Sequence, residues 1–117
     1  MSTKLTIYHN PRCGKSRAAL KELEEKGNDI HVVEYLKDTL SVDEVKLLCS
    51  QLGVSPEALI RKGEELYKST YKNQTLTDTE WFKVLSKHPI LMERPIVVKG
   101  DKAIIARTEG VLAKFLK

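Results

Sequence analysis

The chain has 117 residues, of which 41% are hydrophobic and 31% are charged, and its net charge is +4. This length and balance are typical of one globular domain, so we expect a single domain over residues 1–117. Basic and acidic residues alternate along the chain, which argues against a nucleic-acid-binding protein. No apolar run approaches the ~20 residues of a membrane span, and no secretory signal begins the sequence. We expect a cytoplasmic monomer with no nucleic-acid or membrane partner.

The N-terminal third predicts a strand, a helix and a second strand. Residues 5–8 (LTIY) are β-prone and end at the turn signal Asn10-Pro11. A helix is expected from Ser16 to about residue 27, followed by a strand over residues 30–36 (IHVVEYL). About 20 residues separate the two strands, which is enough for a crossover helix, so we expect them to be parallel.

The middle of the chain predicts helices. Ser41 with Glu44 and Thr77 with Glu80 have the spacing of capping boxes, so each pair marks the start of a helix. Ser55 followed by proline suits the start of another short helix. These helices fall between residues of about 37 and 93.

The C-terminal part predicts a hairpin and a last helix. Residues 95–98 (PIVV) and 103–106 (AIIA) are β-prone and are separated by a turn at Gly100. Thr108 is expected to cap the last helix. A βαβ unit followed by a ββα unit predicts an α/β, thioredoxin-like fold with a four-stranded mixed sheet and a helical insertion.

Cys13 lies in YHNPRCGKSR (residues 8–17), where the predicted first strand leads into the first helix. A nucleotide-binding phosphate loop would need glycine at position 9, which is His9. A cysteine phosphatase loop would need arginine at position 19, which is Ala19. A two-cysteine redox motif would need cysteine at position 16, which is Ser16. The sequence therefore predicts that Cys13 is a functional thiol that acts without a second cysteine in the same motif.

The positive end of a helix stabilises a thiolate, which is the nucleophilic form of cysteine, and it also binds oxyanions. His9, Arg12, Lys15 and Arg17 can add to this stabilisation. The only other cysteine, Cys49, lies on the apolar side of its predicted helix and is interpreted as a small buried hydrophobic residue. With three histidines and no Cys/His cluster, no metal site is expected.

Four segments resemble the arsenate reductase (ArsC) family of the glutaredoxin-coupled type, in the same order and at similar spacing. They are YHNPRCGKSR, ALIRKGEELYK, HPILMERPIVV and AIIARTEG. The resemblance implies that Cys13 is the nucleophile and that Arg61, Arg94 and Arg107 bind the oxyanion. It further implies supporting roles for the residues around the thiol: His9, Asn10, Ser16 and Arg17. It also implies a cis-proline at Pro95.

By this resemblance, Cys13 forms a covalent adduct with arsenate, glutathione attacks that adduct as a co-substrate, and glutaredoxin completes the reduction. No cofactor is expected to be bound. Two alternatives stay open from the sequence. One is a glutathione-dependent thiol oxidoreductase or a reductase of another oxyanion. The other is an RNA-polymerase-binding redox regulator of the same superfamily, although such regulators commonly use a Cys-x-x-Cys switch.

Overall fold

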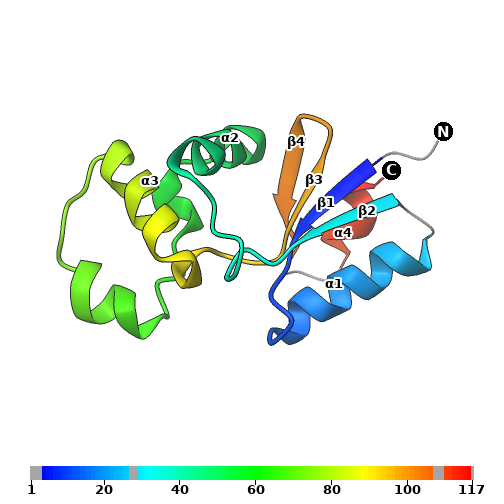
Figure 1. The fold of residues 1–117 in the computed structure, drawn as a ribbon, viewed down its shortest axis with the longest axis horizontal. Coiled ribbons are helices and arrows are strands. Elements are labelled where there is room, and N and C mark those ends of the chain that lie inside the picture. Colours follow the sequence, from blue (N-terminus) through cyan, green and yellow to red (C-terminus); the bar gives the residue numbers. More distant parts are fainter. Residues whose placement is uncertain (1–3, 27–28, 107–109, 117) are drawn as a thin grey trace. The chain divides into compact units, whose positions relative to one another are not determined.

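The computed structural model describes residues 4–26, 29–106 and 110–116. The chain divides into two compact units, Met1–Asp38 with Arg94–Lys117, and Thr39–Glu93, which are described in turn. The elements follow in the order β1 (Lys4–Tyr8), α1 (Gly14–Glu25), β2 (Asp29–Val33), α2 (Val42–Leu52), η1 (Pro56–Leu59), η2 (Tyr67–Tyr71), α3 (Asp78–Lys87), η3 (Pro89–Leu91), β3 (Ile96–Lys99), β4 (Lys102–Ile105) and α4 (Val111–Phe115) (Figure 1).

The first unit is built on a four-stranded sheet with the order β2-β1-β3-β4. Strand β1 runs parallel to β2 and antiparallel to β3, and β3 forms an antiparallel hairpin with β4. Gly100 in the hairpin turn has a φ of 62°, a left-handed conformation that glycine adopts without steric cost. The mixed sheet, the parallel β1–β2 pair and the hairpin confirm the predicted thioredoxin-like arrangement.

Helices α1 and α4 pack on one face of this sheet (Figure 1). Alternate residues of β1, Leu5 and Ile7, are fully buried, as expected for a strand with one face against helices. The core of the unit comprises Leu5, Ile7, Ala19, Leu23, Val97, Ala106 and Leu112. This packing fixes the C-terminal end of β1 and the start of α1, between which Cys13 lies.

Most element boundaries lie within one or two residues of the sequence-based prediction, and three differences bear on the site or the last helix. Helix α1 begins at Gly14, so its first turn includes Ser16 instead of starting there. Strand β2 ends at Val33 because the chain then turns, and the carbonyl of Glu34 accepts hydrogen bonds from the amides of Lys37 and Asp38 at 2.9 Å each. The predicted cap Thr108 lies outside the described residues, and the residue that precedes α4 as its N-cap is Gly110.

The second unit, Thr39–Glu93, is helical. Both predicted capping boxes are present: Ser41 with Glu44 at the start of α2, and Thr77 with Glu80 at the start of α3. Helix α2 packs against α3, and η1 and η3 also contact α3. The buried apolar side chains of this unit include Leu40, Val45, Leu48, Cys49, Leu59, Ile60, Trp81, Leu85, Leu91 and Met92. The unit corresponds closely to the predicted insertion.

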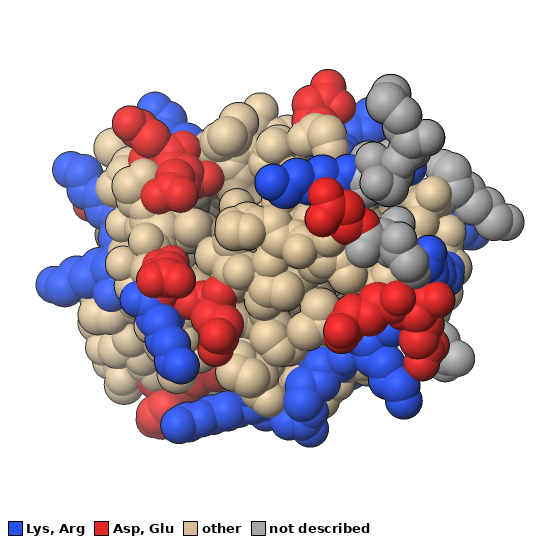
Figure 2. All heavy atoms as spheres, turned by 45° about the vertical axis from the view of Figure 1, so that its right-hand side comes forward, with Lys and Arg blue, Asp and Glu red and all other residues tan. Residues whose placement is uncertain are grey.

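The surface carries both signs of charge. Figure 2 shows Lys and Arg side chains interspersed with Asp and Glu over the face in view. None of the helices in the described part of the chain is long and apolar enough to cross a membrane.

Candidate active site around Cys13

Cys13 is the N-cap residue of α1, with the extended backbone angles φ −99° and ψ 122° that are usual at this position. Its amide donates to the carbonyl of Asn10 at 3.0 Å, and its own carbonyl accepts from the amide of Arg17 at 3.0 Å. The thiol is free and partly exposed. The first amides of a helix have no partners within the helix, so the thiol lies at a site that favours negative charge. The structure confirms the predicted helix-end position.

Ser16 holds the loop before Cys13 in place. Its side chain is fully buried, although serine is a polar residue. The hydroxyl oxygen accepts the amide of Asn10 at 3.0 Å and shares a hydrogen bond of 2.7 Å with Nδ1 of His9. Both partners are themselves buried: His9 is 6% exposed and Asn10 is 8% exposed. Ser16 therefore occupies the place of a second redox cysteine with a hydrogen-bonding group that ties helix α1 to the end of β1.

His9 lies at the end of β1, where its amide donates to the carbonyl of Val33 at 2.8 Å. Burial lowers the pKa of His9, an effect that the nearby carboxylate of Glu34 opposes. Because an ordinary histidine pKa is about 6.5, the imidazole is mainly neutral at pH 7. His9 thus contributes a hydrogen bond to the loop.

Two further contacts fix the shape of the loop. The side-chain Oδ1 of Asn10 accepts the amide of Arg12 at 3.0 Å, which closes an Asx turn. The guanidinium of Arg17 donates to the carbonyl of Pro11 at 3.0 Å. The resemblance predicts supporting roles for Asn10, Ser16 and Arg17, and each of them forms a hydrogen bond within the segment around Cys13.

The loop is flanked on both sides within the sheet unit. On the β3 side, the Arg94–Pro95 peptide bond is cis, as predicted from the resemblance. The carbonyl of Pro95 accepts the amide of Ala106 at 2.8 Å, which extends the β3–β4 pairing by one step. Because β3 pairs with β1, Arg94 lies at the same end of the sheet as Cys13.

Arg94 has an unusual environment for a charged side chain. Its Nε atom is buried and has no hydrogen-bond partner among the described residues. A buried donor without a partner is costly, and an anion that accepts its hydrogen would remove that cost. Arg107, the second predicted arginine of this unit, lies outside the described residues.

On the β2 side, the same loop borders a cavity of about 250 Å³. Its walls come from His9, Asn10, Pro11 and Arg12. The opposite wall comes from Glu34, Leu36 and Lys37, in the turn that follows β2. The cavity therefore has two basic groups, one carboxylate and apolar surface directly beside the loop that leads to the thiol.

Arg61 belongs to the helical unit, where a short antiparallel pairing holds it. Ile60 bridges Met92, and the amide of Arg61 donates to the carbonyl of Leu91 at 2.7 Å. The guanidinium forms an ion pair with Glu64 at 2.5 Å and approaches Glu93 at 3.7 Å. These partners orient Arg61, and they also compete with any anion for its donors.

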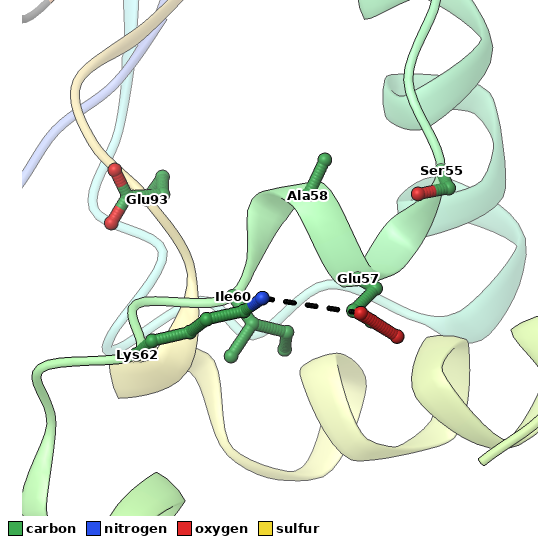
Figure 3. Close-up of a pocket in the computed structure, with 6 residues that line it drawn as sticks. All are labelled: Ser55, Glu57, Ala58, Ile60, Lys62 and Glu93. Carbon is green, nitrogen blue, oxygen red and sulfur yellow. Dashed lines mark ion pairs between the residues drawn. The ribbon is translucent and has the colours of Figure 1, made fainter. Parts of the chain in front are cut away.

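A larger cavity of about 470 Å³ lies in the helical unit (Figure 3). It is lined by Ser55, Glu57, Ala58, Ile60, Lys62 and Glu93, with Lys62 and Glu57 3.9 Å apart. Each of the two carboxylates faces a basic group, Glu57 with Lys62 and Glu93 with Arg61, so the described lining offers an oxyanion no excess of positive charge. Size alone therefore does not identify the candidate site.

The burial and the raised pKa of Cys49 are those of a structural residue. Its side chain is 3% exposed on the inner face of α2. Burial, with a smaller effect from the carboxylate of Asp78, raises the pKa of the Cys49 thiol to about 11. Among the described residues, no group of three His, Cys, Asp or Glu side chains could hold a metal ion.

Comparison with known proteins agrees with this geometry. The ArsC family model matches residues 8–115, which is most of the chain. The chain belongs to the ArsC family. It is 42% identical to the arsenate reductase of Haemophilus influenzae over 112 residues, which cover 94% of this chain and 97% of that protein. It is 38% identical to an arsenate reductase of Escherichia coli over 116 residues, which cover 98% of this chain and 82% of the relative.

Solved structures of family members share the fold as well. The arsenate reductase from Vibrio cholerae superposes with a TM-score of 0.91 at 39% identity, covering 97% of this chain and 98% of that one. A second structure is of a protein from Yersinia pestis that is described as an arsenate reductase. It gives a TM-score of 0.86 at 42% identity and covers 96% of this chain and 97% of that one. The ArsC fold thus extends over almost the whole chain.

Proposed function

We propose that this protein is an arsenate reductase in which Cys13 is the nucleophile and in which glutathione and glutaredoxin supply the electrons. The observation that carries the proposal is the match to arsenate reductases at about 40% identity over nearly the full length. The position of Cys13 at the N-cap of α1 supports it, since this is where an anionic substrate can dock and be attacked.

The first step is substitution at arsenic. The thiolate of Cys13 attacks arsenate and displaces hydroxide, which leaves as water, so an S–As bond replaces an As–O bond and arsenic stays in its pentavalent state. A second thiol, that of glutathione, then replaces another oxygen on the same arsenic with loss of a second water. At this stage no electron has moved.

Reduction occurs in the next step. The thiolate of glutaredoxin attacks the sulfur of the bound glutathione and forms a mixed disulfide. The electron pair of the broken S–As bond remains on arsenic, which becomes trivalent. Water then displaces Cys13 and releases arsenite. Because Ser16 takes the place of a second cysteine, the other two sulfurs come from outside the chain.

Arginines supply the charge that this chemistry needs. Arsenate carries one to two negative charges near neutral pH, and guanidinium groups bind tetrahedral oxyanions with paired hydrogen bonds. Arg94 has the clearest support, because its buried Nε lacks a partner in the described part of the chain. Arg61 and Arg107 complete the proposed set. A reducing compartment such as the cytoplasm supplies the thiols, and we propose that the protein acts there as a monomer.

The test is arsenate-dependent oxidation of NADPH, coupled through glutathione reductase, glutathione and glutaredoxin. Cys13→Ser should abolish turnover, and the matched control Cys49→Ser should retain it, since Cys49 is buried away from solvent. Arg94→Ala should raise the KM for arsenate by at least tenfold, which is the effect of losing one charge-assisted contact. Turnover by the wild type no faster than that of Cys13→Ser would refute the proposed function.

A further inference from the structure

Neither Arg61 nor Arg94 is among the described residues that line the cavity beside the nucleophile loop. Strand β1 lies between β3 and β2, so Arg94 flanks the end of β1 on one side and the cavity flanks it on the other. The register places Tyr8 opposite both Ile96 and Val33, which confirms that all three segments meet at one end of the sheet. A reaction at Cys13 that uses an oxyanion and a thiol needs two neighbouring binding sites. This end of the sheet offers one on each side of β1.

The cavity is lined by side chains of both charges. Arg12 and Lys37 are basic, and Glu34 is acidic. Glu34 and Lys37 approach each other at 3.8 Å, with side chains 41% and 79% exposed. Exposed ion pairs of this kind are weak, so the carboxylate of Glu34 can readily accept a different cation.

Apolar surface completes the cavity. Leu36 is 37% exposed, and both Leu36 and Pro11 line the cavity. A ligand that bears an ammonium, a carboxylate and a short methylene chain would match these three features. The γ-glutamyl end of glutathione has all three.

We propose that this cavity binds the γ-glutamyl end of glutathione, with its ammonium at Glu34, its carboxylate at Arg12 and Lys37, and its methylenes against Leu36. This inference rests on the proposed function, because it locates the co-substrate of that reaction. About 250 Å³ is smaller than most pockets for drug-sized ligands, which suits one arm of the tripeptide better than the whole. Arg12 precedes Cys13 directly, so a ligand held at Arg12 is bound next to the residue that carries the thiol.

Binding can be tested without arsenate, on full-length Cys13→Ser protein, by NMR titration with two dipeptides. γ-Glutamylcysteine keeps the proposed binding group, whereas cysteinylglycine lacks it. The first should shift the amide signals of residues 9–12 and 34–37, and the second should bind at least fivefold more weakly. Arg12→Ala and Glu34→Gln should each weaken γ-glutamylcysteine about fivefold, the effect of one exposed charge pair. Lys21→Ala, an exposed change on α1, should leave the Kd unchanged.

The same variants separate this inference from the proposed function. In the coupled assay, Glu34→Gln should raise the KM for glutathione about fivefold and leave the KM for arsenate within twofold. Equal binding of the two dipeptides, or shifts that map elsewhere, would overturn the glutathione site even if arsenate is reduced normally. Selective binding of γ-glutamylcysteine that depends on Arg12 would support the site even if arsenate is not reduced.

Discussion

Replacement of Ser16 by alanine tests how the nucleophile loop is held. The hydroxyl is fully buried and serves two buried partners, the imidazole of His9 at 2.7 Å and the amide of Asn10 at 3.0 Å. Leaving one buried polar group without a partner costs roughly 1–3 kcal/mol. Alanine returns about 0.5 kcal/mol through its better helix propensity. Because two such partners are left, we expect Ser16→Ala to lower the free energy of unfolding by about 1.5–5.5 kcal/mol.

Urea unfolding followed by far-UV circular dichroism measures this loss. The matched control is Ser50→Ala, the same change at an exposed position of α2, which should alter stability by no more than about 0.5 kcal/mol. Hydrogen exchange supplies a local readout, because the Asn10 amide should exchange faster in Ser16→Ala while the β1 amides stay protected. A loss below about 0.5 kcal/mol with unchanged Asn10 exchange would refute the assigned role of the hydroxyl.

Three further outcomes are expected. Iodoacetamide at pH 8 should modify Cys13 and leave Cys49 intact in the folded protein, because the Cys49 thiol is buried and its pKa is about 11; mass spectrometry that finds both sites modified at similar rates would contradict this. Burial lowers the pKa of His9 in the folded protein, so as the pH decreases the imidazole is protonated in the unfolded chain before it is protonated in the folded protein. Stability should therefore be retained above pH 6.5 and fall as the pH decreases below it. His9→Gln should flatten this dependence in urea titrations at pH 7 and pH 5, and an unchanged slope would exclude His9 as its source. Thr77→Ala should lower the free energy of unfolding by about 1 kcal/mol through the lost N-cap of α3, and urea unfolding that detects no loss would show that this cap is dispensable.

Local signals in the sequence predicted most of the elements. Ser41 with Glu44 and Thr77 with Glu80 are side-chain pairs three residues apart, so the interaction that starts each helix can be read directly from the chain. Gly100 likewise marked the hairpin turn. The end of β2 was missed because Glu34, whose carbonyl closes the turn, resembles any other residue of a β-prone run. Turn hydrogen bonds to a backbone carbonyl leave little trace in the sequence.

The site was predictable where it depends on the backbone and less so where it depends on distant contacts. The position of Cys13 at a helix end followed from the strand–turn–helix pattern. The burial of Ser16 did not, because it depends on how α1 packs against β1. The ion pair between Arg61 and Glu64 has helical spacing and could be found in the sequence, whereas Glu93 reaches Arg61 only through the pairing of two segments far apart in the chain.

The buried hydroxyl of Ser16 also bears on how this chain could evolve. Converting it to cysteine exchanges one oxygen for sulfur and would create the Cys-x-x-Cys spacing of an independent redox enzyme. Sulfur is larger and a weaker hydrogen-bond acceptor, so the exchange would loosen both contacts that shape the loop. A two-cysteine descendant must therefore rebuild the anchoring of His9 and Asn10 at the same time. The proposed dependence on an external thiol would in this sense be maintained by the folding of the loop as well as by its chemistry.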